Sequence, residues 1–525
     1  MANTIVEYMH EHGGYRCGYC GGSNSNYSHG MWAHSLSSQD YQDLLDRGWR
    51  RSGCYLYKPL MDKMCCPCYT IRCNALEFKP SKSQKKVIKK MTRFLSKEER
   101  PSCNPKSVED TEKDEDGDTC LGTSEHPAQE REVRKKMTEA AGIIRTDLTN
   151  VKPNASADVK PNTSAETSKS GQNSDSGGCG TAGDNEDEGQ ELIQEVNSNS
   201  TGVANEPSTR KHPTPGLGPD PSKPPCRKAR EIRRQRRLER LAKSGADVLS
   251  ADKKPQNEPK SLEAMTQEVE KASHGSKHKL EVKLVRSSPE SRQFKETFQE
   301  SHEIFVKYQT TIHKEPDDEC QEEDFKRFLV DSPLQEENLP GAPECGYGSF
   351  HEHFLLDGKI IAVGVLDILP NCVSSVYFYY DPDYSFLSLG TYSALREIEF
   401  TRLLHQEAPK INRYYMGFYI HSCVKMRYKG QYHPSFLLCP EAYTWCPIEQ
   451  CRPKLDVSKY SRLDETDTAD TPVNLQEVRV LYRQMSMRYS DYRRFAPNTG
   501  DEEEVKEYAQ FVGKTCARRI LLYRH

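Results

Sequence analysis

The hydrophobic and polar positions along the chain divide it into two folded blocks separated by a long polar stretch. No Phe, Tyr or Trp occurs between Phe94 and Phe294, although both flanking regions are rich in these residues. The stretch carries acidic runs and a segment rich in Ser, Gly and Asn, a composition typical of disorder. We therefore predict a cysteine-rich N-terminal domain over residues 1–96, a disordered charged linker over 97–275, a larger domain over 276–470 and a helical C-terminal extension over 471–525.

The first block contains two segments with the apolar spacing of amphipathic helices. The run from Ser38 to Leu45 has a capping serine and an apolar face, and Gly48 stops it before several short strands. A second helix is predicted to start at Ser81 or Ser83, because apolar residues recur at helical spacing after it. Its other face is basic and carries Lys82, Lys85, Lys86, Lys89, Lys90 and Arg93. Such a face could follow an RNA backbone, or it could simply be solvated.

The second block mixes strand and helix patterns. The predicted elements are, in order, an alternating strand from Leu280, a helix from Phe294 to Ile312, strands over 350–356, 359–369 and 373–380, a helix from Thr391 to His405 with Leu395, Ile398, Leu403 and Leu404 inward, and a strand over 414–420. Asp357-Gly358 is a strong hairpin signal between two of these strands. This order predicts an α+β or α/β fold with a central mixed sheet, helices on its faces and a ligand crevice beside the loop at 381–390. A last helix over 501–525 is predicted as a packing element.

Charge and targeting signals narrow the class of protein. The chain has 525 residues with 74 basic and 78 acidic side chains, so contact with a nucleic acid must come from local patches. One such patch is the segment Arg227 to Arg240, which could bind RNA, serve as a nuclear address or be a solvated helix. No apolar stretch of membrane length and no signal peptide is present, which predicts a soluble intracellular protein.

The cysteines predict a metal centre. In a reducing compartment the 19 cysteines indicate metal-binding or reactive thiols and not disulfides. Cys17-Gly-Tyr-Cys20 supplies one pair of thiolates, and Cys65-Cys66-Pro-Cys68 supplies a second pair. Four sulfur ligands can bind zinc or an iron–sulfur cluster, and the spacing leaves open whether Cys65, Cys66 or Cys68 completes the set.

Two further segments could carry chemistry. The loop from Asp381 to Gly390 joins a strand to a helix N-terminus, where exposed amides favour a phosphate or carboxylate, although the loop could also be a hydrophobic connector. Its bulky residues differ from the glycine-rich turn with which GNAT-type acetyltransferases hold coenzyme A. The second segment is the strand end from Tyr414 to Lys429. Its cationic groups could grip an acidic side chain or RNA phosphates, or be solvated. We find no P-loop, HExxH motif or Ser-His-Asp ordering.

Four motifs together resemble the eukaryotic arginyl-tRNA–protein transferases. They are CGYC at 17–20, CCPCYTIR at 65–72, YYDPDYSFLSLGTYSALREI at 379–398 and YYMGFYIHSCVKMRYK at 414–429. The resemblance covers both folded blocks and leaves out the linker. It implies a GNAT-like catalytic domain, arginyl-tRNA as the donor, and acceptor proteins with N-terminal Asp, Glu or oxidised Cys. In this family arginylation marks the acceptor for ubiquitin-dependent degradation, which implies a cytoplasmic protein with the nucleus as a second location.

The resemblance also implies the metal ligands, and the chemistry of the transfer suggests candidates for the other sites. The metal ligands are predicted to be Cys17, Cys20, Cys65 and Cys66, holding an iron–sulfur cluster of the 4Fe–4S type, with zinc as the second choice. An acidic pocket should hold the donor guanidinium. The candidate residues are Asp381, Asp383 and Glu397 for that pocket, His421, Lys425 and Arg427 as catalytic residues toward the acceptor or the tRNA end, and Lys429 and Gly390 as further substrate-binding residues.

Two other functions are consistent with parts of the sequence. One is a metal-stabilised RNA-binding protein without transferase activity, which would use the cysteine block, the basic helix and the arginine-rich segment. The other is an N-acyltransferase that uses acetyl-CoA, against which the missing glycine-rich loop argues.

Overall fold

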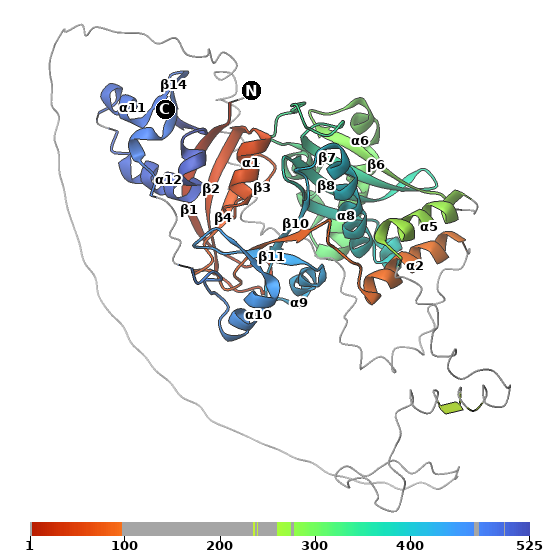
Figure 1. The fold of residues 1–525 in the computed structure, drawn as a ribbon. Coiled ribbons are helices and arrows are strands. Elements are labelled where there is room, and N and C mark those ends of the chain that lie inside the picture. The colour runs from red at the N-terminus through yellow and green to blue at the C-terminus, as the bar shows by residue number, and fades with distance from the viewer. Residues whose placement is uncertain are drawn as a thin grey trace, which may run out of the picture. The chain divides into compact units, whose positions relative to one another are not determined.

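The computed structural model describes residues 3–96, 235–236, 239, 260–274, 278–466, 472–497 and 499–524. All of these except 235–236 and 239 belong to one compact unit, which contains two mixed β-sheets with helices against them (Figure 1). The predicted α+β class with mixed sheets and an N-terminal cysteine group is therefore confirmed. Most of the predicted linker, and most of the basic segment 227–240, lies outside the described residues. No helix in the described ranges is long and apolar enough to span a membrane.

The first sheet joins the two ends of the chain. Its seven strands run in the order β14-β13-β15-β1-β2-β4-β3. Their bounds are β1 Ile5–Tyr15, β2 Asn26–Ser35, β3 Arg50–Ser52, β4 Tyr55–Pro59, β13 Arg479–Tyr482, β14 Met485–Arg488 and β15 Leu521–Arg524, and helices α1 Ser38–Leu45, α11 Tyr489–Phe495 and α12 Glu502–Ala517 accompany them. The N-cap of α1 is Ser37, one residue before the predicted start, and its side chain accepts from the Asp40 N–H.

The C-terminal segment is only partly helical. Helix α12 ends at Ala517, and the residues after it form strand β15, which runs parallel to β1 with Leu521 opposite Ile5. The prediction of a helix to the end of the chain is therefore wrong. Leu521 and Leu522 are buried in the sheet, where β15 lies between β13 and β1, a strand almost the full chain length away.

The second sheet is built mainly from the second block. Its order is β12-β11-β5-β10-β9-β8-β7-β6, and only the β9–β10 pair is parallel. The bounds are β5 Tyr69–Asn74, β6 Leu280–Ser288, β7 Gly348–Leu356, β8 Lys359–Leu369, β9 Cys372–Tyr380, β10 Arg413–Tyr419, β11 Ser435–Leu438 and β12 Trp445–Pro447, with helices α2 Lys82–Ser96, α5 Leu262–His274, α6 Arg292–Tyr308, α7 Glu322–Phe325, α8 Leu389–Glu407, α9 Val424–Arg427 and α10 Ile448–Val457. Asp357 and Gly358 both have positive φ, as the predicted hairpin requires.

Strand β5 comes from the first block and lies between β10 and β11 of the second sheet. The first 96 residues thus supply strands to both sheets, and so do the residues after 278. The predicted domain boundaries stay predictions, while the described parts of both blocks form one unit.

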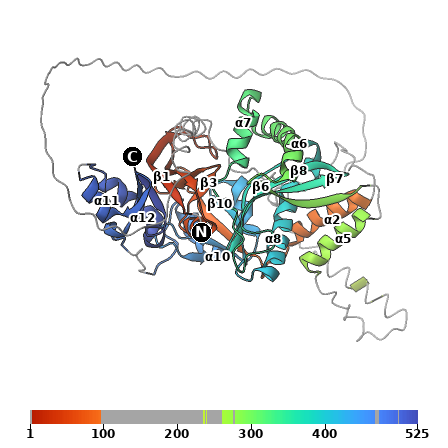
Figure 2. The same cartoon turned by 90° about the horizontal axis from the view of Figure 1, so that it is seen from above.

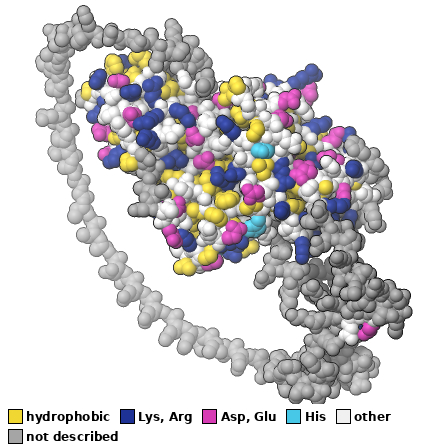
Figure 3. Space-filling model, in the orientation of Figure 1, with side chains coloured by type: hydrophobic (Ala, Val, Ile, Leu, Met, Phe, Trp, Pro, Cys, Tyr) yellow, Lys and Arg dark blue, Asp and Glu magenta, His cyan; other side chains and the backbone are white. Residues whose placement is uncertain are grey.

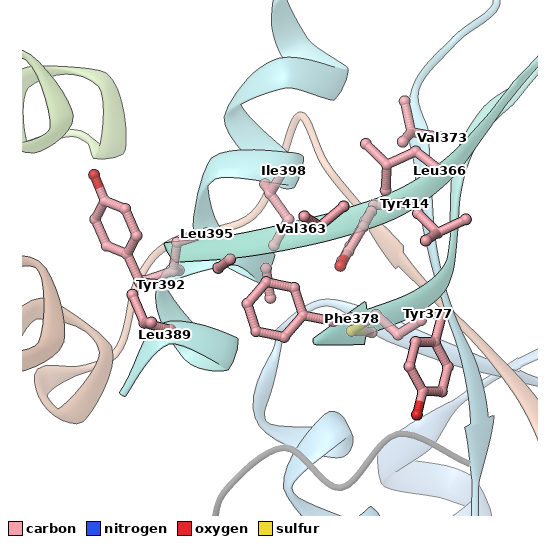
Figure 4. Close-up of a cluster of buried hydrophobic side chains, with 14 of the residues drawn as sticks. Val363, Leu366, Val373, Tyr377, Phe378, Leu389, Tyr392, Leu395, Ile398 and Tyr414 are labelled. Atoms are coloured by element: carbon pink, nitrogen blue, oxygen red, sulfur yellow. The ribbon is translucent and has the colours of Figure 1, made fainter. Parts of the chain in front are cut away.

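Helix α8 connects the parallel strands β9 and β10 and packs on the sheet. Figure 4 shows Leu395 and Ile398 of α8 beside Val363 and Phe378 of the sheet. Leu403, predicted to point inward, is 52% exposed, because the neighbouring Leu404 takes the buried position of that turn. In open sheets, ligand sites form where a strand ends and its connection leaves for a neighbouring strand, so this crossover positions the site.

Helix α5 belongs to the core although it falls in the predicted linker. Leu262, Met265 and Val269 are buried at helical spacing, and α5 packs beside α2 (Figure 2). Residues 262–274 are therefore wrongly assigned to the linker. The assignment rested on missing aromatic residues, and three aliphatic side chains on one helix face are enough to bury this helix.

Candidate active site and metal centre

Four cysteines from two loops meet at one point. Their sulfur atoms, in Cys17, Cys20, Cys65 and Cys66, all lie within 4.8 Å of one another. Cys17 and Cys20 follow β1, and Cys65 and Cys66 precede β5. The Sγ atoms of Cys20 and Cys65 are 3.3 Å apart. The predicted ligand group is therefore brought together, and it could hold a metal ion.

The acidity of these thiols is uneven. A hydrogen bond from the backbone of Gly22 lowers the pKa of Cys20 to about 7, whereas burial raises the pKa of Cys65 to about 11 and also raises that of Cys66. Because a metal binds thiolates, loading this site releases protons, including those of Cys65 and Cys66, whose raised pKa values keep them protonated at neutral pH.

The thiols as placed fit one ion. Four thiolates about 2.3 Å from a zinc ion lie about 3.8 Å from one another, within the spread seen here. An iron–sulfur cluster needs its thiolates farther apart, which requires rotation of the more accessible side chains, Cys20 and Cys65. An all-sulfur donor set suits either group.

Cys68 is separate from the ligand group. Its thiol is buried and donates to the Cys66 carbonyl, 3.3 Å away. The apolar cluster around these cysteines includes Phe418, Ile420 and Met426, which lie on β10 and in the segment after it. The four-cysteine group is thus packed against the strand whose end carries the predicted catalytic segment.

A pocket of about 900 Å³, counted with its open mouth, lies at the β9–α8–β10 crossover. Its lining comes from both sheets. The residues are Tyr41, Arg50, Arg51, Tyr57, Phe328, Ser374, Ser375, Val376, Tyr377, Phe378, Gly390, Ser393, Ala394, Glu397, Tyr414, Met416, Gly417, Phe418, Tyr428, Lys429 and Tyr432. Few of these lining residues are charged, which is usual for a ligand site.

Glu397 is the carboxyl of this lining. It is 1% exposed, and its Oε2 accepts a hydrogen bond of 2.7 Å from the Tyr414 hydroxyl. Burial raises the pKa of Glu397, while bonds from Tyr414, Ser375 and Ser393 oppose the rise. A second buried carboxyl, Glu352, lies behind it across Gly364, where an added Cβ would be 3.4 Å from Glu397 Oε1 and 3.7 Å from Glu352 Oε2. Glu352 Oε2 has no hydrogen-bond partner in the described residues.

Arg50 and Lys429 supply the positive charge. The Arg50 side chain is buried, donates to the Trp49 and Gly417 carbonyls, and has an Nε with no partner within the described ranges. Burial, together with the neighbouring Arg50 charge, lowers the pKa of Lys429 to about 7. The pocket therefore combines a fixed cation, a lysine that can be neutral at physiological pH and a buried carboxyl.

The other predicted cationic residues lie outside this lining. His421 bonds to the Tyr419 hydroxyl at 2.7 Å and to Asp456 Oδ1 at 2.8 Å. Arg427 is exposed and donates to the His421 carbonyl, and Lys425 is exposed on α9. These three residues are near one another in sequence, but only Lys429 of the predicted cluster reaches the pocket.

Among the predicted acidic residues, only Glu397 lines the pocket. Asp381 and Asp383 both pair with Lys307, at 2.6 and 2.7 Å. Gly390, in the first turn of α8, does line the pocket. The roles assigned to all of these residues stay predictions, while the geometry unites Glu397, Lys429 and Gly390.

Sequence reasoning did not find Arg50. A local signal was the pair of consecutive arginines between Trp49 and Cys54, whereas the burial of their strand at every position is visible only in the structure. A buried charge needs a partner, so such a pair in an apolar setting indicates a built site.

Comparison with known proteins supports an aminoacyl-tRNA-dependent enzyme. Residues 15–86 match the sequence profile described as Arginine-tRNA-protein transferase, N terminus, and residues 300–439 match the C terminus of the same family. The chain is 40% identical over 529 residues to arginyl-tRNA–protein transferase 1 of Drosophila melanogaster, and the match covers 99% of each chain. It is 35% identical over 511 residues to the Arabidopsis thaliana protein of that name, covering 86% of this chain and 74% of the plant one.

A shorter match reaches a bacterial enzyme. The aspartate/glutamate leucyltransferase of Stutzerimonas stutzeri is 37% identical over 143 residues, covering 26% of this chain and 53% of the bacterial one.

The matched segments contain the four-cysteine group and all the residues that line the pocket, and together they define a transferase enzyme of the aminoacyl-transferring class. Within that class the agreement extends over both sheets and nearly the whole chain. The chain belongs to the family of arginyl-tRNA–protein transferases.

Proposed function

We propose that this enzyme transfers arginine from arginyl-tRNA to the α-amino group of proteins that begin with Asp, Glu or oxidised Cys. The observation that carries the proposal is the pocket, which places a buried carboxyl, Glu397, and the cations Arg50 and Lys429 around one space. The donor brings a guanidinium and the acceptor brings a carboxylate or sulfonate, so both substrates find an opposite charge. The names of the insect and plant relatives agree with this donor. The bacterial relative is named an aspartate/glutamate leucyltransferase, which agrees with acidic acceptors but names another aminoacyl group.

On the donor side, Glu397 is suited to the arginyl guanidinium. A guanidinium beside a buried carboxyl favours its ionised form and forms charge-assisted hydrogen bonds. The Tyr414 hydroxyl already holds one carboxylate oxygen, so Glu397 is oriented before the donor arrives. An uncharged aminoacyl group would leave the carboxyl without its partner.

On the acceptor side, Arg50 and Lys429 have different roles, one in binding the acidic side chain and one in accepting a proton. Arg50 stays charged and can bind the acceptor's acidic side chain. The amine must lose a proton before it attacks the ester carbonyl, and a lysine with a pKa of about 7 can take that proton. The new amide bond forms as the ester bond breaks, and the tRNA 3′-terminal oxygen leaves with a proton. Because the ester is already activated, alignment of amine and carbonyl supplies most of the remaining rate.

The direct test uses purified protein, arginyl-tRNA and two peptides, one with free and one with acetylated N-terminal Asp. We expect the mass of one arginine residue to be added to the free peptide alone. A third peptide beginning with oxidised Cys tests the wider acceptor range. The proposal would be contradicted if no peptide gained mass while the arginyl-tRNA stayed intact and the four-cysteine site was loaded with metal. That result would favour the alternative of an RNA-binding protein without transferase activity.

Replacing Glu397 by Gln should lower kcat/KM for arginyl-tRNA by roughly 100-fold, because a buried charge pair is replaced by a neutral contact of the same shape. Selectivity for arginyl- over leucyl-tRNA should fall by a similar factor. The matched control is Glu399→Gln, the same change two residues along α8, where the side chain contacts Thr266 instead of the pocket. Equal effects of the two variants would rule out a specific role for Glu397.

The proposed role of Lys429 predicts how kcat depends on pH. Because its neutral form is the proton acceptor, kcat at saturating acceptor should rise with pH up to about 7 and then level off. Lys429→Met should lower kcat by about 100-fold and remove this step. Lys429→Arg keeps the charge but cannot release a proton, so it should be as inactive as the Met variant. An active Arg variant would instead make Lys429 a simple cation for the acceptor.

We infer that the four cysteines hold an iron–sulfur cluster, with zinc as the second choice, on the strength of the resemblance and the all-thiol donor set. When bound, such a group would cross-link the loop after β1 to the segment before β5 beside β10, and a cluster would add sensitivity to oxidants. We also propose ubiquitin-dependent degradation of the arginylated acceptors, and action in the cytoplasm and the nucleus. A degradation assay of an Asp-starting reporter in cells with and without the enzyme, followed in both fractions, tests these points.

A further inference from the structure

Helix α2 carries a straight row of exposed cations. Lys82, Lys86, Lys89 and Arg93 are all exposed and follow one another at intervals of four, three and four residues. At 1.5 Å per residue this stripe is about 16 Å long. The opposite face, with Ile88, Met91 and Leu95, is buried in the core.

The stripe is not neutralised within the described residues. None of its four members pairs with a carboxylate there, although over the face seen in Figure 3 acidic and basic side chains are interspersed. The acids of α5, the adjacent helix, pair elsewhere: Glu263 with Arg402, Glu270 with Arg396 and Glu268 with Lys260. Like charges at such spacing weaken a helix, so the stripe does not serve stability.

The C-terminal half of α2 contacts the segment that leads into α8, just before the pocket-lining Gly390. Lys90, half-buried between the stripe and the core, donates to the Ser388 hydroxyl at 3.1 Å. Phe94 contacts Phe386, with ring centroids 5.6 Å apart. Ser388 directly precedes α8, and Gly390, two residues later, lines the pocket. A ligand whose end enters the pocket can therefore extend along α2.

We propose that the stripe of Lys82, Lys86, Lys89 and Arg93 binds phosphates of the acceptor stem of arginyl-tRNA and so positions its arginyl end. This inference rests on the proposed function. The donor ends in a short single strand followed by an A-form stem, which proteins recognise largely through phosphates and shape. A membrane surface fits less well, because the apolar face of α2 is already used in the core and cannot insert.

The test compares the triple variant Lys86→Gln, Lys89→Gln and Arg93→Gln with a control triple that loses equal charge elsewhere, Lys283→Gln, Lys295→Gln and Lys410→Gln. A plot of log affinity against log salt concentration has a negative slope, and each lost phosphate contact makes that slope shallower by about 0.9. Between 50 and 200 mM salt, KM for arginyl-tRNA should therefore rise on the order of 40-fold more in wild type and control than in the α2 variant. At low salt the α2 variant should show a raised KM and an unchanged kcat.

A donor without a stem, an arginyl ester of the trinucleotide CCA, separates the possible results. Wild type and α2 variant should use it equally well, which also shows that the variant is folded and its pocket intact. An unchanged KM and salt slope for full-length tRNA would overturn the stem-binding inference, and so would equal losses with both donors. If wild type transfers arginine from neither donor, the proposed function itself fails.

Discussion

Replacing Arg51 by Met should lower the free energy of unfolding by about 3–5 kcal/mol, because it leaves a buried carboxylate without its partner. Arg51 lies on β3 of the first sheet and Asp367 on β8 of the second. Two parallel hydrogen bonds of 2.7 Å join the guanidinium to both carboxylate oxygens, and Ser349 binds both partners. The two side chains are 1% and 0% exposed, so water cannot replace the lost bonds. Chemical denaturation of the metal-loaded protein measures the change.

Two further variants separate the ion pair from other effects. Arg51→Met combined with Asp367→Leu should recover part of the loss, since no unpaired charge remains. Arg292→Met breaks an exposed ion pair, since the Arg292 side chain is 93% exposed and that of its partner Glu296 is 60% exposed. It should lower the free energy of unfolding by less than about 1 kcal/mol. If Arg51→Met were as mild as Arg292→Met, the pair would not hold the two sheets together.

Replacing Cys17 or Cys66 by Ser should remove nearly all bound metal and lower the thermal unfolding temperature. Both thiols are buried and converge with Cys20 and Cys65, so either replacement removes one of the four thiolates gathered there. Structural metal sites of this kind contribute on the order of 10 kcal/mol to folding of their segment. Iron, inorganic sulfide and zinc contents of protein purified without oxygen give the readout, and they also distinguish a cluster from a single zinc ion.

Cys68→Ser is the matched control, because Cys68 is equally buried and only two residues from Cys66 but its thiol points to a backbone carbonyl. It should keep the wild-type metal content. Metal loss in this variant comparable to that of Cys66→Ser would mean that Cys68, and not the adjacent pair, completes the ligand set.

The helices and the central strands were predictable because their side chains repeat with the period of the element. The hairpin at Asp357 and helix α8 show this clearly, since each has a strong local signal. Strands β1 and β2 were not predicted. Their sequences carry histidines and glutamates among the apolar residues, and α12 covers part of them through pairs such as His10 with Glu504. These strands pair with each other and with β4, but the neighbours that cover their polar side chains, β15 and α12, lie far along the chain.

The candidate site also has a part that the local sequence predicts and a part that it does not. Local sequence was enough for the cysteine pairs, because two short motifs hold the thiols that one metal needs. It was not enough for the pocket, where Arg50, Glu397 and Lys429 come from three distant segments. Which of the charged residues around 381 and 421–429 face the pocket depends on how α8 and β10 pack, and no local pattern encodes that.

By itself the sequence determined the elements with strong periodicity, the metal-binding motifs, the basic face of α2 and the family. The tertiary structure alone decided that β5 completes the second sheet, that β15 joins β1, and that Glu397 and Lys429 share a pocket while Asp381 and Arg427 do not. The physical reason is the distance along the chain over which each interaction acts. Periodicity and capping act within a few residues, whereas sheet pairing and buried charge depend on partners hundreds of residues away.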